Sequence, residues 1–164
     1  MSDRPDGPTG LTGPSSLTGP SSLIEIDHVA VAVRDLDAAI DWYKSTLGAV
    51  VAHRELVESD GVEEALLAVA ESFIQLITPT VDTSPVAKFL ERKGEGLHHV
   101  GYRVTDCALA LERMRAAGAQ LIDTAPRPGS RGTTVAFVHP RSAFGTLIEL
   151  VQEQGAGQSP RNWR

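Results

Sequence analysis

The stretch GLHHVGYRV, residues 96–104, decides the fold, because an earlier stretch, EIDHVAVAV at residues 25–33, repeats it in the same phase. In this alignment His99 falls on His28, and both stretches carry the aliphatic residues of a buried strand. A chain that repeats itself in this way is built from equivalent structural units. We therefore expect two modules of the same architecture.

A second pair of matching stretches lies further along each half. Residues 146–150, TLIEL, match residues 72–76, SFIQL, so that Glu149 falls on Gln75. Four residues that are able to ligate a metal thus occupy two pairs of equivalent positions, each inside a predicted buried strand.

The composition is that of an acidic, packed domain. The chain has 164 residues, of which 41% are hydrophobic, a formal net charge of −6 and a pI near 5.3. This charge argues against nucleic acid or an anionic membrane as the main partner and favours a small molecule. The single cysteine, the absence of an apolar run of about 20 residues and the absence of a signal peptide predict a cytoplasmic protein.

The first module is predicted to follow a βαβββ order. A strand over residues 23–33 leads to an N-cap at Asp35, a helix with apolar residues at helical spacing, and Gly48 in the C-cap position. Three further strands are predicted at residues 50–57, 62–70 and 72–78.

The second module repeats this order. A strand over residues 97–104 leads to an N-cap at Asp106 and a helix that ends at Gly118. The remaining strands are predicted at residues 119–122, 133–138 and 145–151.

The predicted fold class is α+β, with two tandem βαβββ modules, a mixed β-sheet and flanking helices. The modules span residues 23–80 and 96–152, and a connecting helix over residues 84–93 begins at Ser84-Pro85. They form a single domain over residues 23–153. A disordered Gly/Pro/Ser/Thr-rich arm is predicted at residues 1–22 and a flexible tail at residues 154–164.

The four aligned residues form a candidate metal site. Strand alternation places Ala30 beside His28 and Gly101 beside His99, and these small residues leave room for the imidazoles. If the modules pair around a pseudo-twofold axis, two imidazoles, an amide oxygen and a carboxylate converge on one cleft, with room for two further ligands. Such a set suits one divalent ion of Co, Mn, Ni, Fe or Zn.

The alternative is that each of the four is a buried polar residue with its own hydrogen-bond partner. Glu149 lies inside the aliphatic run 147–151, where an unpaired carboxylate is costly, and Gln75 occupies the matching slot. A shared cation accounts for both. Of the other histidines, His98 is predicted to point to the opposite face in a structural role, and His139 to border the pocket.

These stretches resemble the vicinal oxygen chelate superfamily, which includes glyoxalase I, extradiol dioxygenases and bleomycin or fosfomycin resistance proteins. Within it the chain is most similar to the methylmalonyl-CoA epimerases. The resemblance implies that the two modules pair into a cup-like sheet and that the metal ligands are His28, Gln75, His99 and Glu149. It is carried by IDHVA at 26–30, FIQLITP at 73–79, SPVAKFL at 84–90, GEGLHHV at 94–100 and FVHPRSAFGTLIEL at 137–150.

The resemblance further implies an epimerase that inverts the 2-position of methylmalonyl-CoA, or of a close 2-alkylmalonyl-CoA, through an enolate. Such enzymes use two carboxylates, one of which corresponds to Glu149. The other is a glutamate in a stretch like EQGV, where this chain has Ser59 within ESDGV, residues 58–62. We expect Asp60 to serve as the second base. Glu58, a bound water, a different substrate, or a merely solvated turn are the alternatives.

Substrate contacts are expected from the loop APRPGSRG, residues 125–132. Its guanidinium groups, Arg127 and Arg131, suit the phosphates of coenzyme A, and His139 borders the pocket. We expect an acyl-CoA substrate and a homodimer.

Two other functions remain open. A glyoxalase-type lyase also places four ligands across two modules, and a ligand-binding or resistance protein of the same fold needs no second base. Binding of a malonyl-type CoA ester or of a glutathione conjugate distinguishes an epimerase from a glyoxalase.

A chain that begins at Leu23 is expected to keep its fold and its metal affinity, because residues 1–22 lack an apolar pattern. Thermal unfolding and metal titration of the shortened protein check this expectation. A large drop in melting temperature would contradict it.

Overall fold

The computed structural model describes residues 23–155. The predicted arm, residues 1–22, lies outside the described residues, as do residues 156–164 of the predicted tail. No helix among residues 23–155 is long and apolar enough to cross a membrane.

One mixed sheet of eight strands forms the body of the molecule, in the order β2-β3-β4-β1-β5-β8-β7-β6. Each half of this order belongs to one module, so the predicted α+β fold of two paired modules is confirmed. The strands are β1 (Leu23–Ala32), β2 (Val50–Val57), β3 (Val62–Val69), β4 (Ser72–Pro79), β5 (Gly96–Val104), β6 (Arg127–Pro128), β7 (Thr134–Val138) and β8 (Leu147–Gln152).

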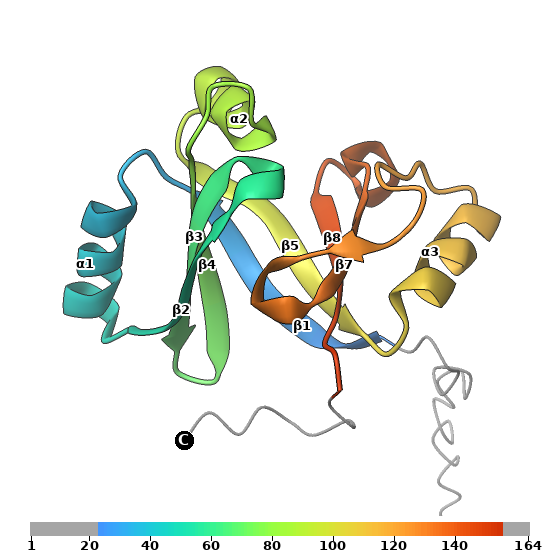
Figure 1. Cartoon of the computed structure of the whole chain (residues 1–164), viewed down its shortest axis with the longest axis horizontal. Helices are drawn as coiled ribbons and strands as arrows, with labels where there is room; N and C mark the ends of the chain where they lie inside the picture. The colour runs from blue at the N-terminus through green and yellow to red at the C-terminus, as the bar shows by residue number, and fades with distance from the viewer. Residues whose placement is uncertain (1–22, 156–164) are drawn as a thin grey trace, which may run out of the picture.

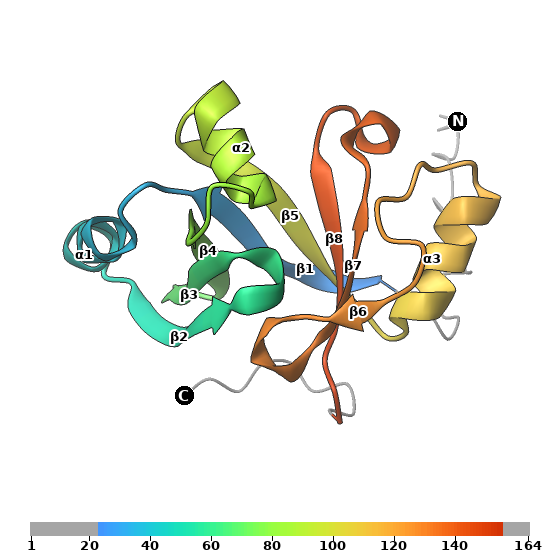
Figure 2. The same cartoon turned by 45° about the horizontal axis from the view of Figure 1, so that its top comes forward.

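The two halves join along β1 and β5, which pair antiparallel and run side by side from one half to the other (Figures 1 and 2). Within each half the outer partner is parallel: β4 pairs with β1, and β8 pairs with β5. The helices α1 (Leu36–Leu47) and α3 (Cys107–Ala116) lie on the two outer flanks, and α2 (Pro85–Lys93) connects the halves (Figure 1).

The helices begin where the sequence places their caps. The side chain of Asp35 accepts from the Ala38 N–H, that of Ser84 from the Ala87 N–H, and that of Asp106 from the Leu109 N–H. Each cap satisfies one of the N–H groups that a helix start leaves without a partner. Gly48 ends α1 in the left-handed conformation, as its C-cap position predicts.

The second module departs from prediction at its edge. Residues 119–122 form no strand; Leu121 makes a single bridge to Val138, and the two-residue β6 takes the edge position. Pro126 and Pro128 carry no backbone N–H, so this edge cannot extend into a longer ladder.

The apolar core is divided into three clusters. One lies under α1 and includes Leu36 and Leu76, one lies under α3 and includes Leu111 and Leu150, and one packs under α2 against β1 and β4. The clusters under α1 and α3 cover the outer side of the sheet. The cluster under α2 lies on the inner side, because its residues Val62, Ile77 and Val86 also line the pocket that holds Gln75, His99 and Glu149.

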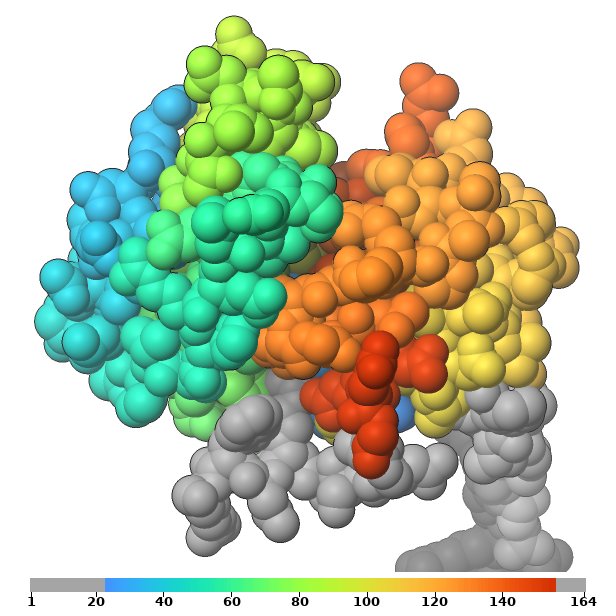
Figure 3. Space-filling model, in the orientation of Figure 1, coloured from blue at the N-terminus to red at the C-terminus, as the bar shows by residue number. Residues whose placement is uncertain are grey.

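The halves meet again where the 3₁₀ turn η2 (Ser130–Gly132) reaches β2. The backbone N–H of Arg131 donates to Glu55 Oε2 at 2.9 Å, and the two surfaces touch (Figure 3). The two halves are thus joined at a second place besides the β1–β5 ladder.

The register of the central strands places a small residue beside each predicted histidine. Gly101 of β5 lies between His28 of β1 and Glu149 of β8, whereas Ala30 of β1 lies between Gln75 of β4 and His99 of β5. A Cβ atom at Gly101 would come within 2.4 Å of the His28 ring. The space at Gly101 is thus filled by His28 of the neighbouring strand and not, as alternation within β5 predicted, by His99.

Replacing Gly101 by alanine is expected to lower the free energy of unfolding by about 1–3 kcal/mol, the usual cost of overpacking. Gly101 does not have a positive φ, so without the clash the same change would stabilise the chain by about 0.4–1 kcal/mol through the unfolded state. Chemical denaturation of the metal-free protein measures the sign. A stabilised variant would mean that the His28 ring does not occupy this space.

Candidate metal centre and pocket

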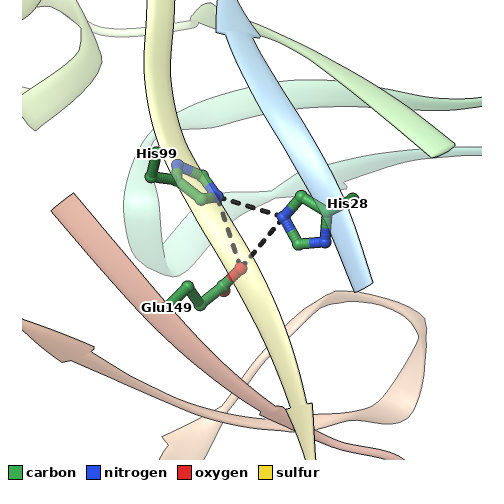
Figure 4. Close-up of side chains that lie close together, drawn as sticks. All are labelled: His28, His99 and Glu149. Carbon is green, nitrogen blue, oxygen red and sulfur yellow. Dashed lines mark hydrogen bonds and ion pairs between the residues drawn. The ribbon is translucent and has the colours of Figure 1, made fainter. Parts of the chain in front are cut away.

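Three buried side chains from three strands point toward one another: His28 from β1, His99 from β5 and Glu149 from β8 (Figure 4). The two Nε2 atoms are 3.1 Å apart, and Glu149 Oε2 lies 3.1 Å from the Nε2 of His28 and 3.3 Å from that of His99. Three potential ligand atoms thus form a nearly equilateral triangle.

The size of this triangle fits a divalent ion. Two ligand atoms at a right angle around an ion with bonds of about 2.1 Å are about 3.0 Å apart. Two imidazoles and one carboxylate on one face, with the other positions open, are a common ligand set for divalent transition metals. The three residues therefore suit an open six-coordinate site.

Gln75, the fourth predicted ligand, lines the same pocket as His99 and Glu149. Its Nε2 donates to Glu64 Oε2 at 2.8 Å, whereas its Oε1 is buried without a hydrogen-bond partner. A buried carbonyl oxygen without a partner is costly, and a cation would satisfy it.

In the metal-free centre the three ligands shift one another's pKa values. Burial by itself would raise the pKa of Glu149, but contacts with His28 and His99 outweigh it and hold the pKa of this carboxyl far below its usual range. Burial lowers the pKa of His28, but contacts with Asp27 and Glu149 outweigh that effect and raise this pKa to about 9. The pKa of His99 is lowered, chiefly by burial. His28 therefore holds a proton that a metal must displace.

Each histidine is oriented by a partner on its other nitrogen. His28 Nδ1 lies 2.8 Å from Asp27 Oδ1, and His99 Nδ1 lies 2.8 Å from His98 Nδ1. The prediction that His98 points away from the site is wrong, because His98 lines the pocket. The β1–β5 ladder shifts register between Ala30 and Val31, opposite this segment, and so breaks the simple alternation on which the prediction relied.

Glu64 is a site residue that was not predicted from the sequence: this carboxylate on β3 is only 5% exposed and lines the pocket with Gln75 and Glu149. Its Oε1 is buried without a hydrogen-bond partner. Burial raises the pKa of Glu64, and the nearby charge of Glu149 adds to the rise. Strand alternation with the buried Val62 and Leu66 is the sequence signal that places Glu64 on the inner face.

Asp60, the predicted second base, lines the outer part of the pocket. Its side chain is 34% exposed and forms an ion pair with Arg127, whose NH1 atom lies 3.0 Å from Asp60 Oδ1. Arg127 also lies 3.5 Å from Asp123 and over the ring of Phe137. Glu58 and Ser59 are exposed and are not among the lining residues.

The other two predicted substrate contacts lie outside this pocket, which has a volume of about 180 Å³ and is open to solvent. The guanidinium of Arg131 is buried against Asp27, with 3.0 Å between NH2 and Oδ1. His139 caps the 3₁₀ turn η3 (Pro140–Ala143) by accepting the Arg141 N–H. Substrate roles for both residues stay predictions.

The chain is similar in sequence to a known family and to curated proteins within it. The Glyoxalase/Bleomycin resistance protein/Dioxygenase superfamily matches residues 27–137. The ethylmalonyl-CoA/methylmalonyl-CoA epimerase of Cereibacter sphaeroides is 38% identical over 129 residues, which are 77% of this chain and 96% of that protein.

Solved structures of similar sequence share the fold. The methylmalonyl-CoA epimerase from Mycobacterium tuberculosis has a TM-score of 0.78 and 38% identity, covering 87% of this chain and 93% of that one. A methylmalonyl-CoA epimerase in complex with methylmalonyl-CoA and NH4+ has a TM-score of 0.79 and 36% identity, covering 84% of this chain and 100% of that one. The chain therefore belongs to the Glyoxalase/Bleomycin resistance protein/Dioxygenase superfamily, as a relative of its methylmalonyl-CoA epimerases.

Proposed function

We propose that this protein is a metal-dependent epimerase that inverts the 2-position of methylmalonyl-CoA or a close 2-alkylmalonyl-CoA. The observation that carries the proposal is a pair of buried carboxylates, Glu64 and Glu149, in one pocket beside the histidine pair. They come from β3 and β8, which lie in opposite halves of the sheet. The relative that binds methylmalonyl-CoA supports the substrate class.

Inversion needs a proton acceptor on one face of the substrate carbon and a proton donor on the other. The acidic hydrogen of a 2-alkylmalonyl thioester lies between two carbonyl groups, and its removal leaves negative charge on their oxygens. We assign the two proton-transfer positions to Glu64 and Glu149. Burial raises the pKa of Glu64 above that of an exposed glutamate, which makes this carboxylate a stronger proton acceptor.

The pocket residues also fit a role for a metal. A divalent ion held by His28, His99, Glu149 and the carbonyl oxygen of Gln75 supplies electrostatic stabilisation for the negative charge that develops on the substrate oxygens. Co, Mn, Ni, Fe and Zn all suit these ligands. The hydrogen bond from Gln75 Nε2 to Glu64 ties the orientation of this ligand to that of the base.

Asp60 and Arg127 take a different part in this scheme. Their ion pair engages the Asp60 carboxylate with Arg127, whereas the Glu64 carboxylate lies buried beside Gln75. Both side chains are about one-third exposed, so they lie at the solvent end of the pocket. We assign Arg127 to the coenzyme A portion of the substrate, and Asp60 to holding the Arg127 guanidinium in place.

A glyoxalase-type lyase is the second candidate. It differs from an epimerase in substrate, a glutathione conjugate in place of a CoA ester. A ligand-binding or resistance protein of the same fold is disfavoured, because binding alone gives no reason to bury two carboxylates in one pocket.

The homodimer and the cytoplasmic location also stay proposals. Trp42, Leu47 and Val50 are large apolar residues at least half exposed near the end of α1, and they form a candidate contact between copies. The free cysteine, Cys107, is buried, in keeping with a reducing compartment. Sedimentation analysis tests the dimer.

The metal proposal predicts that His99→Ala weakens Co²⁺ binding more than tenfold, in the range expected when a ligand is lost. His139→Ala is the matched control and should bind like the parent. Affinity should rise with pH up to about 9, because His28, with its pKa of about 9, must release a proton before binding.

The same pKa gives the sign of the stability change. Its rise above the unfolded value means that protonated His28 stabilises the metal-free protein below about pH 6.5, and that this contribution is lost as pH rises through about 9. The gain in melting temperature on adding Co²⁺ should therefore grow between these values. A gain that shrinks as pH rises would contradict the assignment.

The base assignment predicts that Glu64→Gln slows epimerisation by a factor on the order of 10² or more while Co²⁺ still binds. Asp60→Asn should mainly raise the KM for the CoA ester, and the exposed Glu58→Gln should behave like the parent. Chirality of a single methylmalonyl-CoA epimer is followed over time. If Glu64→Gln turns over normally and Asp60→Asn or Glu58→Gln loses most of its kcat, the assignment of Glu64 is wrong. The residue whose replacement lowers kcat is then the second base.

Isotope exchange adds a second readout. With two bases, a reaction in heavy water should place deuterium in the product from the first turnover while recovered substrate initially keeps its hydrogen. A single base would return the original hydrogen to either face.

A further inference from the structure

A line of charged groups runs from η2 of the second module to the metal centre. Arg131 NH2 donates to Asp27 Oδ1 at 3.0 Å, and the same oxygen lies 2.8 Å from His28 Nδ1. The side chains of Asp27 and His28 are 0% and 1% exposed, and that of Arg131 is 13% exposed. The three groups are therefore shielded from water and depend on one another.

The direction of these contacts fixes the imidazole. His28 Nδ1–H donates to Asp27, so Nε2 points toward His99 and Glu149. A histidine ligand is commonly held in this way by a carboxylate on its other nitrogen. Here the carboxylate is itself buried, and a buried carboxylate is costly without a cation partner. Arg131 supplies that cation.

The backbone around Arg131 is shaped to deliver the side chain inward. Arg131 has φ +57, a left-handed conformation that a non-glycine residue adopts at a cost of roughly 1–2 kcal/mol. Its N–H is held by Glu55, and the next residue, Gly132, is also left-handed. An unfavourable backbone conformation persists where surrounding contacts fix it, and the Asp27 and Glu55 contacts do so here.

We propose that Arg131 is a positioning residue for the metal centre, which through Asp27 fixes the orientation of the ligand His28. The inference rests on the proposed metal site. A turn in the second module thereby fixes the orientation of a metal ligand in the first module. It also gives Arg131 a task other than contact with coenzyme A, in keeping with its burial away from the lining of the substrate pocket.

The test uses Co²⁺ alone as the probe and measures both its affinity and its visible absorption spectrum. Arg131→Met removes the charge while keeping length, and should weaken Co²⁺ binding by about 10–100-fold and shift the absorption bands. Arg131→Lys keeps a charge without the planar fork and should recover part of the loss. Asp27→Asn should match Arg131→Met in direction.

Arg103 offers a matched control. It is 6% exposed and pairs with Glu25 and Glu153, at 2.8 and 3.2 Å, without contacting a ligand. Arg103→Met and Arg103→Lys should lower stability but leave Co²⁺ affinity within about twofold of the parent and the spectrum unchanged, since they leave the ligands in place. If Arg131→Met does not fold, the comparison of Arg131→Lys with Arg103→Lys decides the question.

A double variant separates a relay from two independent effects. If Arg131 acts through Asp27, the two losses of affinity should not add. The double variant of Arg131→Met and Asp27→Asn should then have about the same Co²⁺ affinity as whichever single variant has the lower affinity. Parent-like binding by the Arg131 variants, equal losses in the Arg103 variants, or additive losses would each overturn the proposal. Because Co²⁺ binding is measured without substrate, a protein that binds Co²⁺ but fails to epimerise would overturn the proposed function and leave the relay intact.

Discussion

The structure depends on the close approach of β1 and β5 at two positions where side-chain bulk is missing. Gly101 has no side chain to keep the His28 ring away, and Ala30 leaves the corresponding space between Gln75 and His99. Since these strands are the joint between the modules, the same residues that let the halves pair also open the space for the polar centre. The packing of the two modules and the formation of the polar centre therefore depend on the same two small residues.

The buried polar groups constrain one another more than they stabilise the fold. A carboxylate such as Glu149 is tolerated among aliphatic residues because two imidazoles face it, and Asp27 is tolerated because His28 and Arg131 do. The apolar clusters under the helices supply the stability that offsets these desolvation costs. Removing one member would leave its partners uncompensated, so the network favours a single arrangement of the two halves.

The features that the sequence predicted are those with a local cause. Helix caps at Asp35, Ser84 and Asp106 follow from side-chain hydrogen bonds within three residues, and the duplication aligned His28 with His99 without knowledge of their contacts. That alignment sufficed to bring together both histidines and Glu149.

The features that it missed depend on strand register and on partners distant in sequence. In the sequence Glu64 is one of two neighbouring acids within a predicted strand. Only the pairing of β3 with β4 brings its side chain against that of Gln75. The position of His98 reflects an irregular ladder, and the inward direction of Arg131 reflects a left-handed turn facing the other module. Strand alternation places Glu64 on the inner face, but its contact with Gln75, the position of His98 and the direction of Arg131 follow from contacts between segments distant in sequence.

The near-symmetry of the two modules is broken at one slot, where Gln75 in the first half corresponds to Glu149 in the second. Two neutral imidazoles, one amide and one carboxylate bring a total charge of −1 to a divalent ion. A divalent ion on these four ligands would leave a net charge of +1, and the carboxylate of Glu64 lies in the same pocket, hydrogen-bonded to Gln75. An ionised carboxylate in place of the amide could not donate this hydrogen bond and would add a like charge beside Glu64. The duplication thus gives the shape of the site, and the one departure from it lets a metal ligand donate to the neighbouring carboxylate.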